Sequence, residues 1–194
     1  MKSAILSLLL TALFCQAKPQ FAKHNSEIPW SSISSVAMTD LSGGKQRITA
    51  KELSIFIMLS PECPLCKTYI PVINNLQRKY PGIHIYGIIP GSAYSVDELK
   101  VFQKSYTLQF PLLIDARKRL TTVLKATTTP ECILIDKEGS VDYRGLIDNW
   151  AYSLGQQRKV TTEHYLAAAI QATLLNQQVP TTYTKPIGCR INDI

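Results

Sequence analysis

Four short apolar runs stand out along the chain, and each has the pattern of a buried strand. They are Leu53–Leu59, Ile83–Ile89, Pro111–Ile114 and Cys132–Ile135. Near-continuous apolar runs of this length indicate strands that are buried on both faces, as in a sheet covered by helices. The core pattern begins near Val36, because the residues before it are polar and show no clear periodicity.

Helices are expected between and after these runs, from apolar residues three or four positions apart and from capping residues. They are a helix over 64–80, a helix after the capping box Ser95–Glu98, a short helix over 116–125 with Asp115 as its cap, and a last helix capped by Thr161 or Thr162.

A hairpin is expected before the last helix. Lys137–Ser140 has the composition of a turn and separates the strand residues 133–136 from 141–144. Strands and helices alternate before this hairpin. The order of elements therefore predicts an α/β fold with a central mixed sheet flanked by helices.

The composition fits one globular domain. The chain has 194 residues, of which 45% are hydrophobic, and this is enough for a sizeable core. Its formal net charge is +7, but the basic residues are scattered, which is typical of a solvated surface and not of a nucleic-acid site. We divide the chain into a signal peptide (1–17), a lead-in (18–35), a domain (36–178) and an irregular tail rich in Pro and Thr (179–194).

The first seventeen residues have the pattern of a secretory signal peptide. A short positive start precedes the apolar run 4–14, and the segment ends on the small residue Ala17. The run is too short to span a membrane. Anchoring through Cys15 is disfavoured, because bulky Leu13 and Phe14 precede that cysteine. We therefore expect a soluble protein that is exported to the periplasm or outside the cell, where conditions are oxidising.

Cys63 and Cys66 form a CxxC motif at the start of the helix expected over 64–80. A cysteine at a helix N-terminus is close to unpaired N–H groups and the positive end of the helix dipole, which favour its thiolate. Pro64 suits the first helical position, where its missing N–H costs nothing. We therefore expect Cys63 to be an exposed nucleophile and Cys66 a buried resolving cysteine.

Other interpretations of this motif have less support. A zinc site needs a second Cys/His pair at comparable spacing, and a c-type haem site needs His where residue 67 is Lys. We therefore expect no metal and no bound cofactor. A structural disulfide in a non-enzymatic binding module remains an alternative, and a dithiol that titrates at a cellular potential would exclude it.

The neighbourhood of the motif resembles the thioredoxin superfamily. Cys63–Lys67 followed by Pro71 matches its pattern of CxxC, Lys and a proline inside the helix, and Thr129-Pro130 resembles its cis-proline loop. The resemblance covers about residues 36–175 and implies a thioredoxin-like fold. It also implies that Pro130 faces the dithiol and that the backbone at Thr129 binds an extended substrate. An ordinary trans proline at the start of a strand is the other interpretation.

The interval between Cys66 and Pro130 is longer than a minimal thioredoxin needs. An inserted element around residues 90–110 is similar to the redoxin branch of the superfamily, which includes exported reductases and peroxiredoxins. Two features depart from the thioredoxin pattern. Glu62 replaces the usual tryptophan and should oppose a Cys63 thiolate, and the run Leu53–Leu59 contains no acidic residue that could accept a proton.

A peroxiredoxin-like thiol peroxidase is the alternative function. Ser60 stands three residues before Cys63, where a hydroxyl helps to bind peroxide in such a site. The proline expected seven residues before Cys63 is absent, because residue 56 is Phe. Arg144 is a candidate partner for the thiolate, without positional support.

The remaining candidate residues are accessory, namely Ser60, Lys67, Cys132 and Cys189. Cys132 lies two residues after Pro130 and should face the same side of the sheet. For Cys189, we favour a structural disulfide to Cys132 that fixes the tail. A thiol that reaches the active site and a free thiol are the alternatives.

The sequence thus predicts an exported thiol-disulfide oxidoreductase. Cys63 and Cys66 would carry the exchange, and Glu62, Pro64, Thr129 and Pro130 would face the substrate. The expected partners are proteins that carry a disulfide or a dithiol, and a redox protein that resets the CxxC pair. The direction of exchange is open, since the reduction potential depends on how well the fold stabilises the thiolate.

Overall fold

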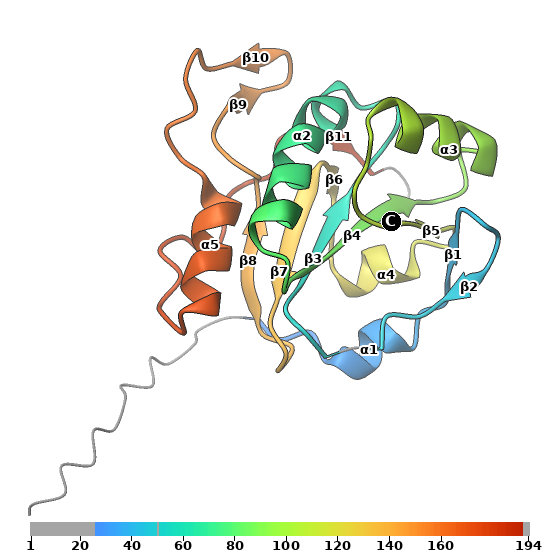
Figure 1. Cartoon of the computed structure of the whole chain (residues 1–194), viewed down its shortest axis with the longest axis horizontal. Helices are drawn as coiled ribbons and strands as arrows, with labels where there is room; N and C mark the ends of the chain where they lie inside the picture. The colour runs from blue at the N-terminus through green and yellow to red at the C-terminus, as the bar shows by residue number, and fades with distance from the viewer. Residues whose placement is uncertain (1–25, 50, 192–194) are drawn as a thin grey trace, which may run out of the picture.

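A seven-stranded mixed sheet forms the centre of the protein in the computed structural model, which describes residues 26–49 and 51–191 (Figure 1). The strand order is β2-β1-β5-β4-β3-β7-β8, with β3, β4 and β5 parallel and the other neighbours antiparallel. The strands are β1 (Met38–Asp40), β2 (Lys45–Gln46), β3 (Ser54–Met58), β4 (His84–Pro90), β5 (Leu112–Asp115), β7 (Glu131–Ile135) and β8 (Val141–Gly145).

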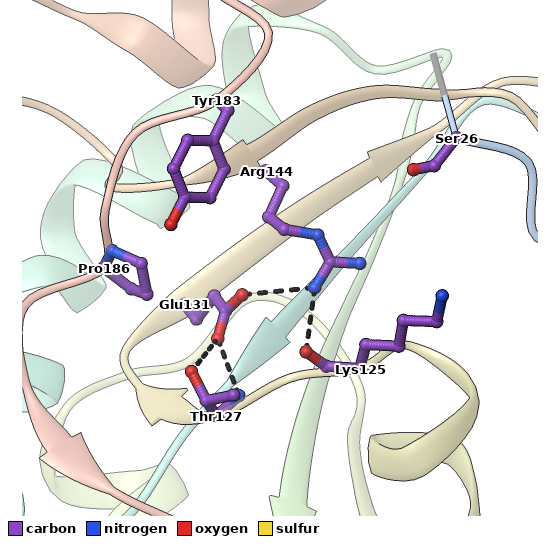
Figure 2. A pocket seen from close by; sticks show the side chains of 7 residues that line it. All are labelled: Ser26, Lys125, Thr127, Glu131, Arg144, Tyr183 and Pro186. Carbon is purple, nitrogen blue, oxygen red and sulfur yellow. Dashed lines mark hydrogen bonds and ion pairs between the residues drawn. The ribbon is translucent and has the colours of Figure 1, made fainter.

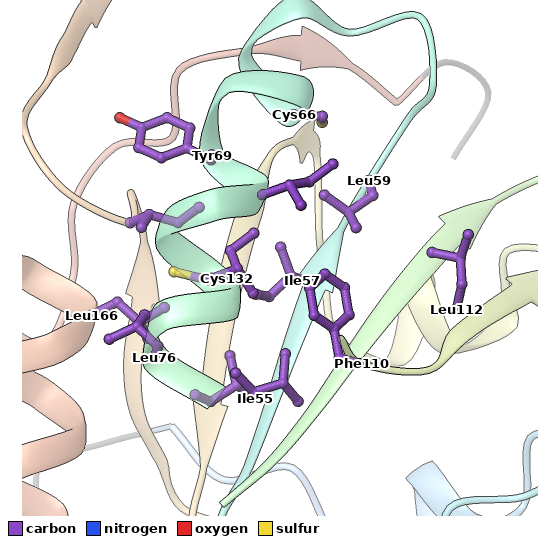
Figure 3. Packing of buried hydrophobic residues seen from close by; sticks show 14 of the residues in the cluster. Ile55, Ile57, Leu59, Cys66, Tyr69, Leu76, Phe110, Leu112, Cys132 and Leu166 are labelled. Carbon is purple, nitrogen blue, oxygen red and sulfur yellow. The ribbon is translucent and has the colours of Figure 1, made fainter. Parts of the chain in front are cut away.

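Helices cover both faces of this sheet. On one face, a large apolar cluster includes side chains of α2 (Pro64–Lys79), α3 (Val96–Ser105) and α5 (Tyr165–Leu174). Figure 3 shows part of this cluster, with side chains of α2 and α5. On the other face, a second cluster includes side chains of α1 (Trp30–Ser34) and α4 (Arg119–Val123). The predicted α/β fold, with a mixed sheet between helices, is confirmed.

Strand β3 shows why the apolar runs are continuous. Ile55 and Ile57 belong to the cluster beneath α2, whereas Phe56 and Met58 belong to the cluster on the opposite face. Successive side chains of a strand point to opposite faces, so a strand covered on both sides needs apolar residues at every position. All five residues of β3 are buried.

The expected capping box and hairpin are present. The Ser95 hydroxyl accepts a hydrogen bond from the Glu98 N–H, and the Glu98 carboxylate accepts one from the Ser95 N–H, at the start of α3. This helix lies between β4 and β5, in the interval where the inserted element is expected. The turn between β7 and β8 contains Gly139, whose φ of +95° favours glycine.

Two helix starts differ from the expectation. Helix α4 begins at Arg119 and not at 116, because Lys118 has a left-handed backbone with φ of +53°. Asp115 still accepts hydrogen bonds from the N–H groups of Arg119 and Thr121. Helix α5 begins at Tyr165 and not after Thr161 or Thr162. The Asn149 side chain accepts from the Thr162 N–H, so this residue is held in the preceding loop.

The segments on either side of the domain are more ordered than the sequence pattern indicates. Within the expected lead-in, Trp30 and Ile33 of α1 are buried in the core. The expected irregular tail contains a short strand, β11 (Cys189–Arg190), which pairs antiparallel with β6 (Thr128–Thr129). A second small hairpin consists of β9 (Ala151–Ser153) and β10 (Gln156–Gln157).

Both segments also contact β8. The carbonyl of Ser26 accepts from the Val141 N–H, and the carbonyl of Thr182 accepts from the Arg144 N–H. The Thr184 N–H donates to the Arg144 carbonyl. The expected signal peptide and Cys15 lie outside the described residues. Within the described part of the chain, no helix is long and apolar enough to cross a membrane.

Candidate functional site

Cys63 and Cys66 lie at the N-terminal end of helix α2, a few residues after strand β3 ends. Strand β3 ends at Met58, a short turn follows, and α2 begins at Pro64 with Cys63 as its N-cap residue. Pro64 occupies the first helical turn, where no N–H is needed, and is exposed. Cys66 is fully buried beneath the first turn. The helix start expected for the CxxC motif is therefore confirmed.

The loop before β7 reaches the same point. The peptide bond between Thr129 and Pro130 is cis, as the thioredoxin resemblance implies. The Cys63 Sγ lies 3.1 Å from the Thr129 carbonyl oxygen and, in its protonated form, donates a hydrogen bond to it. Residues 66 positions apart in the sequence thus meet at one end of the sheet.

Cys63 is covered in this structure. Only 1% of the residue is exposed, whereas the sequence predicts an exposed nucleophile, so that expectation is wrong for this conformation. The reason is that the Thr129 carbonyl oxygen lies 3.1 Å from the Cys63 sulfur and that Cys189 lies opposite Thr129. The tail strand β11, which the sequence does not indicate, brings Cys189 there.

The two sulfurs of the motif have opposite tendencies to ionise. Hydrogen bonds lower the pKa of Cys63 to about 4, chiefly one from the Cys66 thiol, and they outweigh the opposing effect of burial. The Cys189 thiol and the backbone N–H groups of Cys66 and Cys189 add to this effect. Burial raises the pKa of Cys66, and the neighbouring Cys63 raises it further. The pair therefore combines a thiolate with a protonated thiol.

Cys189 is a third thiol at this site. It lies opposite Thr129 in the β6–β11 pair and is half-buried. Burial and then the hydrogen bond and charge of Cys63 raise the pKa of Cys189 to about 11. Cys189 therefore keeps its proton and can donate it in a hydrogen bond to the Cys63 thiolate.

The favoured disulfide between Cys132 and Cys189 is wrong. Cys132 is fully buried in β7, and its thiol donates to the Gly145 carbonyl at 3.2 Å. Both cysteines are free thiols, and Cys189 lies opposite Thr129 in the β6–β11 pair. Burial raises the pKa of Cys132, so this residue acts as a small apolar side chain in the core.

Ser60 and Glu62 precede the motif but interact mainly with a tyrosine. The Ser60 hydroxyl and the Tyr94 hydroxyl are 2.8 Å apart and share a hydrogen bond. Glu62 is exposed, and its charge and hydrogen bond raise the pKa of Tyr94, although burial raises it more. Lys67 is half-buried, and its N–H donates to the Cys63 carbonyl within the first helical turn.

Arg144 interacts with a carboxylate and not with a thiolate. It forms an ion pair with Glu131 at 3.3 Å and donates to the carbonyl of Lys125 (Figure 2). It also donates to the carbonyl of Leu124. Glu131 is buried on the face of β7 opposite to Cys132 and also accepts from the Thr127 N–H. The suggestion that Arg144 is a partner of the Cys63 thiolate is therefore wrong.

Sequence reasoning missed two residues near the thiols. Tyr94 follows β4 in a loop, and no sequence pattern connects it with Ser60. Gly188 lies against the loop of Thr129, where an added Cβ would be 2.1 Å from the Thr129 carbonyl oxygen. A glycine directly before Cys189 in a tail is the one signal that could have indicated a close backbone approach.

A dithiol at a helix start, a cis-proline loop beside it and a mixed sheet between helices define a thioredoxin-like oxidoreductase. A model of the AhpC/TSA family matches residues 31–144, which are more than half of the chain. The chain belongs to the AhpC/TSA family.

Individual proteins resemble this chain over most of its length. The thiol-disulfide oxidoreductase ResA of Bacillus cereus is 30% identical in an alignment of 139 positions that covers 66% of this chain and 71% of the relative. An uncharacterized conserved protein from Geobacillus kaustophilus aligns with a TM-score of 0.73 and 21% identity, over 88% of this chain and 92% of that structure. A secreted disulfide oxidoreductase of Mycobacterium tuberculosis aligns with a TM-score of 0.51 and 20% identity, over 57% and 82%. The two solved structures share the fold of this chain.

Proposed function

We propose that this protein exchanges disulfides with other proteins through Cys63 and Cys66. The observation that carries the proposal is the position of the two cysteines: Cys63 caps α2 with its sulfur 3.1 Å from the Thr129 carbonyl oxygen, and Cys66 is buried in the first helical turn. The lowered pKa of Cys63 and the raised pKa of Cys66 support the same assignment. A thiolate is the reactive form in disulfide exchange. The neighbouring cysteine is a protonated thiol, so it attacks only in the second exchange, after it has lost its proton. The similarity to the ResA oxidoreductases supports the same chemistry.

The reaction proceeds in two exchanges. The Cys63 thiolate attacks one sulfur of a substrate disulfide, a bond between Cys63 and that sulfur forms, and the other substrate sulfur leaves as a thiolate. The Cys66 thiol then loses its proton and attacks Cys63. A Cys63–Cys66 disulfide forms, the substrate leaves with both sulfurs reduced, and two electrons have passed from the protein to the substrate. The reverse sequence oxidises a substrate dithiol.

The cis-proline loop is the proposed binding surface for the substrate. Thr129 lies against Cys63 and already pairs with an extended segment, β11, so its backbone is suited to bind an extended peptide. Pro130 is next to it, while the exposed Glu62 and Pro64 flank the Cys63 position from the helix side. A protein thiol partner resets the pair after each turnover.

Export of the protein is part of this proposal. The pattern of residues 1–17 supports a cleaved signal peptide, and the domain would then extend over 36–178. In an oxidising compartment, a dithiol needs a reducing partner to act as a reductase, or a disulfide-generating partner to act as an oxidase.

Two serine variants test the proposed roles. Cys63→Ser should abolish reduction of insulin disulfides, because it removes the attacking sulfur. Cys66→Ser should accumulate a mixed disulfide between Cys63 and insulin, because the second exchange is blocked. Cys132→Ser is the control and should keep the activity, since Cys132 is buried away from the site. If Cys66→Ser reduces insulin as fast as the unchanged protein, the proposed mechanism is incorrect.

Peroxide reduction is the competing function, and the geometry supports it less. The Ser60 hydroxyl shares its hydrogen bond with Tyr94, and Arg144 is paired with Glu131. We therefore expect reduced protein to react with hydrogen peroxide far more slowly than efficient peroxidases do. A stopped-flow rate constant above about 10⁵ M⁻¹s⁻¹, in the range of efficient enzymes, would favour the peroxidase function instead.

A further inference from the structure

The C-terminal segment 182–191 is fixed along the same end of the molecule as the dithiol. Its first part is held by backbone hydrogen bonds between Thr182, Thr184 and Arg144. Its last part pairs with β6, and the Ile191 N–H donates to the Thr127 carbonyl. The family model ends at residue 144, so the match says nothing about this segment.

The close approach of this segment depends on Gly188. Its Cα lies so near to the Thr129–Pro130 peptide that a Cβ would be 2.1 Å from the Thr129 oxygen and 3.1 Å from the Pro130 nitrogen. No side chain fits there without moving backbone. The next residue, Cys189, stands opposite Thr129 in the strand register. Glycine thus allows the strand to bring Cys189 to the loop that also contacts Cys63.

Cys63 and Cys189 meet at the same residue of the cis-proline loop. The Cys63 sulfur lies 3.1 Å from the Thr129 carbonyl oxygen, and Cys189 pairs with Thr129 in the β6–β11 register. The pKa of Cys63 is lowered in part by Cys189, in agreement with this placement. Cys189 packs against the apolar cluster that contains Cys63 and Cys66. The arrangement corresponds to an extended substrate that pairs with the cis-proline loop and presents a cysteine to the nucleophile.

We propose that Cys189 is a third redox-active residue, which forms a disulfide with Cys63 by exchange with the Cys63–Cys66 disulfide. This inference rests on the proposed function, because substrate reduction is what produces the Cys63–Cys66 disulfide. The tail strand is then an internal redox partner of the CxxC pair, and an external protein must displace it to reach Cys63.

The exchange is balanced within the chain. Cys189 loses its proton, and its sulfur attacks the Sγ of Cys63. The Cys63–Cys189 bond forms, the Cys63–Cys66 bond breaks, and the electron pair leaves on the Cys66 sulfur, which takes up a proton. One disulfide and one thiol are present before and after, so no oxidant or reductant is consumed. Burial favours the protonated form of Cys66, which suits a sulfur that is released as a thiol.

Peptide mapping of the oxidised full-length chain tests the proposal. The chain is oxidised with glutathione disulfide, freed of glutathione, incubated, quenched with acid, alkylated and digested without reduction. We expect both Cys63–Cys66 and Cys63–Cys189 linkages, the second in about one molecule in ten or more, which corresponds to a free-energy difference within about 1.4 kcal/mol. In Cys66→Ser, most oxidised molecules should carry Cys63–Cys189 within one chain. Cys132 should be recovered as an alkylated thiol throughout.

Two control variants keep this test interpretable. Cys66→Ser combined with Cys189→Ser should accumulate Cys63 as a mixed disulfide with glutathione. Cys66→Ser combined with Gly188→Val keeps all other sulfurs but displaces the strand, and it should lower the Cys63–Cys189 yield at least about tenfold. Circular dichroism checks that each variant is folded.

The outcomes separate this inference from the proposed function. If Cys66→Ser yields glutathionylated Cys63 with a free Cys189, or links Cys63 to Cys189 only between two chains, Cys189 is not an internal redox partner. Insulin reduction that depends on Cys63 and Cys66 would still support the proposed function in that case. If insulin reduction fails while Cys63–Cys189 forms, the proposed function is wrong and the contact between the two sulfurs remains reactive.

Discussion

The sulfur of Cys63 is almost completely buried, and burial by itself would raise its pKa. The pKa is low because several donors converge on the sulfur, with the Cys66 thiol as the largest contributor. Cys66 therefore lowers the pKa of Cys63 before any disulfide forms. This effect can be separated from its role as the resolving thiol, since the first concerns a hydrogen bond and the second concerns a covalent bond.

Replacing Cys66 with alanine should raise the pKa of Cys63. The largest hydrogen bond to the thiolate is lost, so the thiolate forms only at higher pH. We expect the midpoint of the pH profile for alkylation of Cys63, followed by peptide mapping, to rise by about one unit or more. Cys66→Ser keeps a hydroxyl donor and should give a smaller rise. Identical midpoints in Cys66→Ala and the unchanged protein would show that the hydrogen bond has no such effect.

The ion pair of Arg144 and Glu131 is expected to matter for stability. Glu131 is 2% exposed, and removal of Arg144 would leave its charge buried without a cationic partner. Arg144→Met should therefore lower the free energy of unfolding by about 3 kcal/mol. Urea titration measures this change. The double variant Glu131→Gln with Arg144→Met should recover part of the loss, and a loss below about 1 kcal/mol in the single variant would contradict the argument.

At the scale of elements, the sequence predicted the strands and helices that a local pattern of apolar residues identifies. The strands around β3 and the helix that starts at Pro64 are long enough for their apolar spacing to identify them. Strand β11 has two residues, and it pairs with Thr128–Thr129 about sixty positions earlier. Such a pairing leaves no periodic signal in the sequence. The expected bridge to Cys132 was wrong for this reason, because no sequence pattern indicated that Cys189 pairs with Thr129.

Displacing β11 should make Cys63 more accessible. Gly188→Val introduces a side chain where even a Cβ would overlap the Thr129 carbonyl, so the tail strand should move away from the loop. We expect alkylation of Cys63 in the reduced protein to become at least about tenfold faster at a pH where the thiolate is fully formed, since access then limits the rate. Peptide mapping over time measures it.

The matched control is Gly155→Val. Gly155 lies between β9 and β10, and an added Cβ there meets no atom within 4 Å. Its φ of +73° makes the substitution strained, but the strain is confined to that hairpin. Alkylation of Cys63 should therefore be unchanged in this variant. Equal rates in both variants would mean that the tail does not limit access.

At the scale of the whole molecule, the thiolate couples stability to pH. The folded pKa of Cys63 is about 4, while an unfolded cysteine has a pKa of about 8.5. Between these values the unfolded state binds more protons, so the free energy of unfolding of the reduced protein rises with pH. The contribution is fully present above about pH 8.5 and is lost as the pH falls towards 4.

Comparison with Cys63→Ser isolates this contribution. Urea titrations in reductant at several pH values should show the stability difference between the unchanged protein and Cys63→Ser increasing from about pH 5 to about pH 8. Above that range, the raised pKa values of Cys66 and Cys189 act in the opposite direction in both proteins. A difference that stays constant across the range would exclude a native thiolate at Cys63.

The hydrogen bonds that Ser26, Thr182 and Thr184 make to β8 have a separate consequence for solubility. Strand β8 is the outermost strand of the sheet on its side, and an uncovered outermost strand can recruit strands of other molecules. Segments from before and after the domain occupy its free N–H and C=O groups at both ends. Because Thr182–Thr184 bind to β8 independently of Cys189, the last residues can leave the dithiol while this strand stays shielded from aggregation.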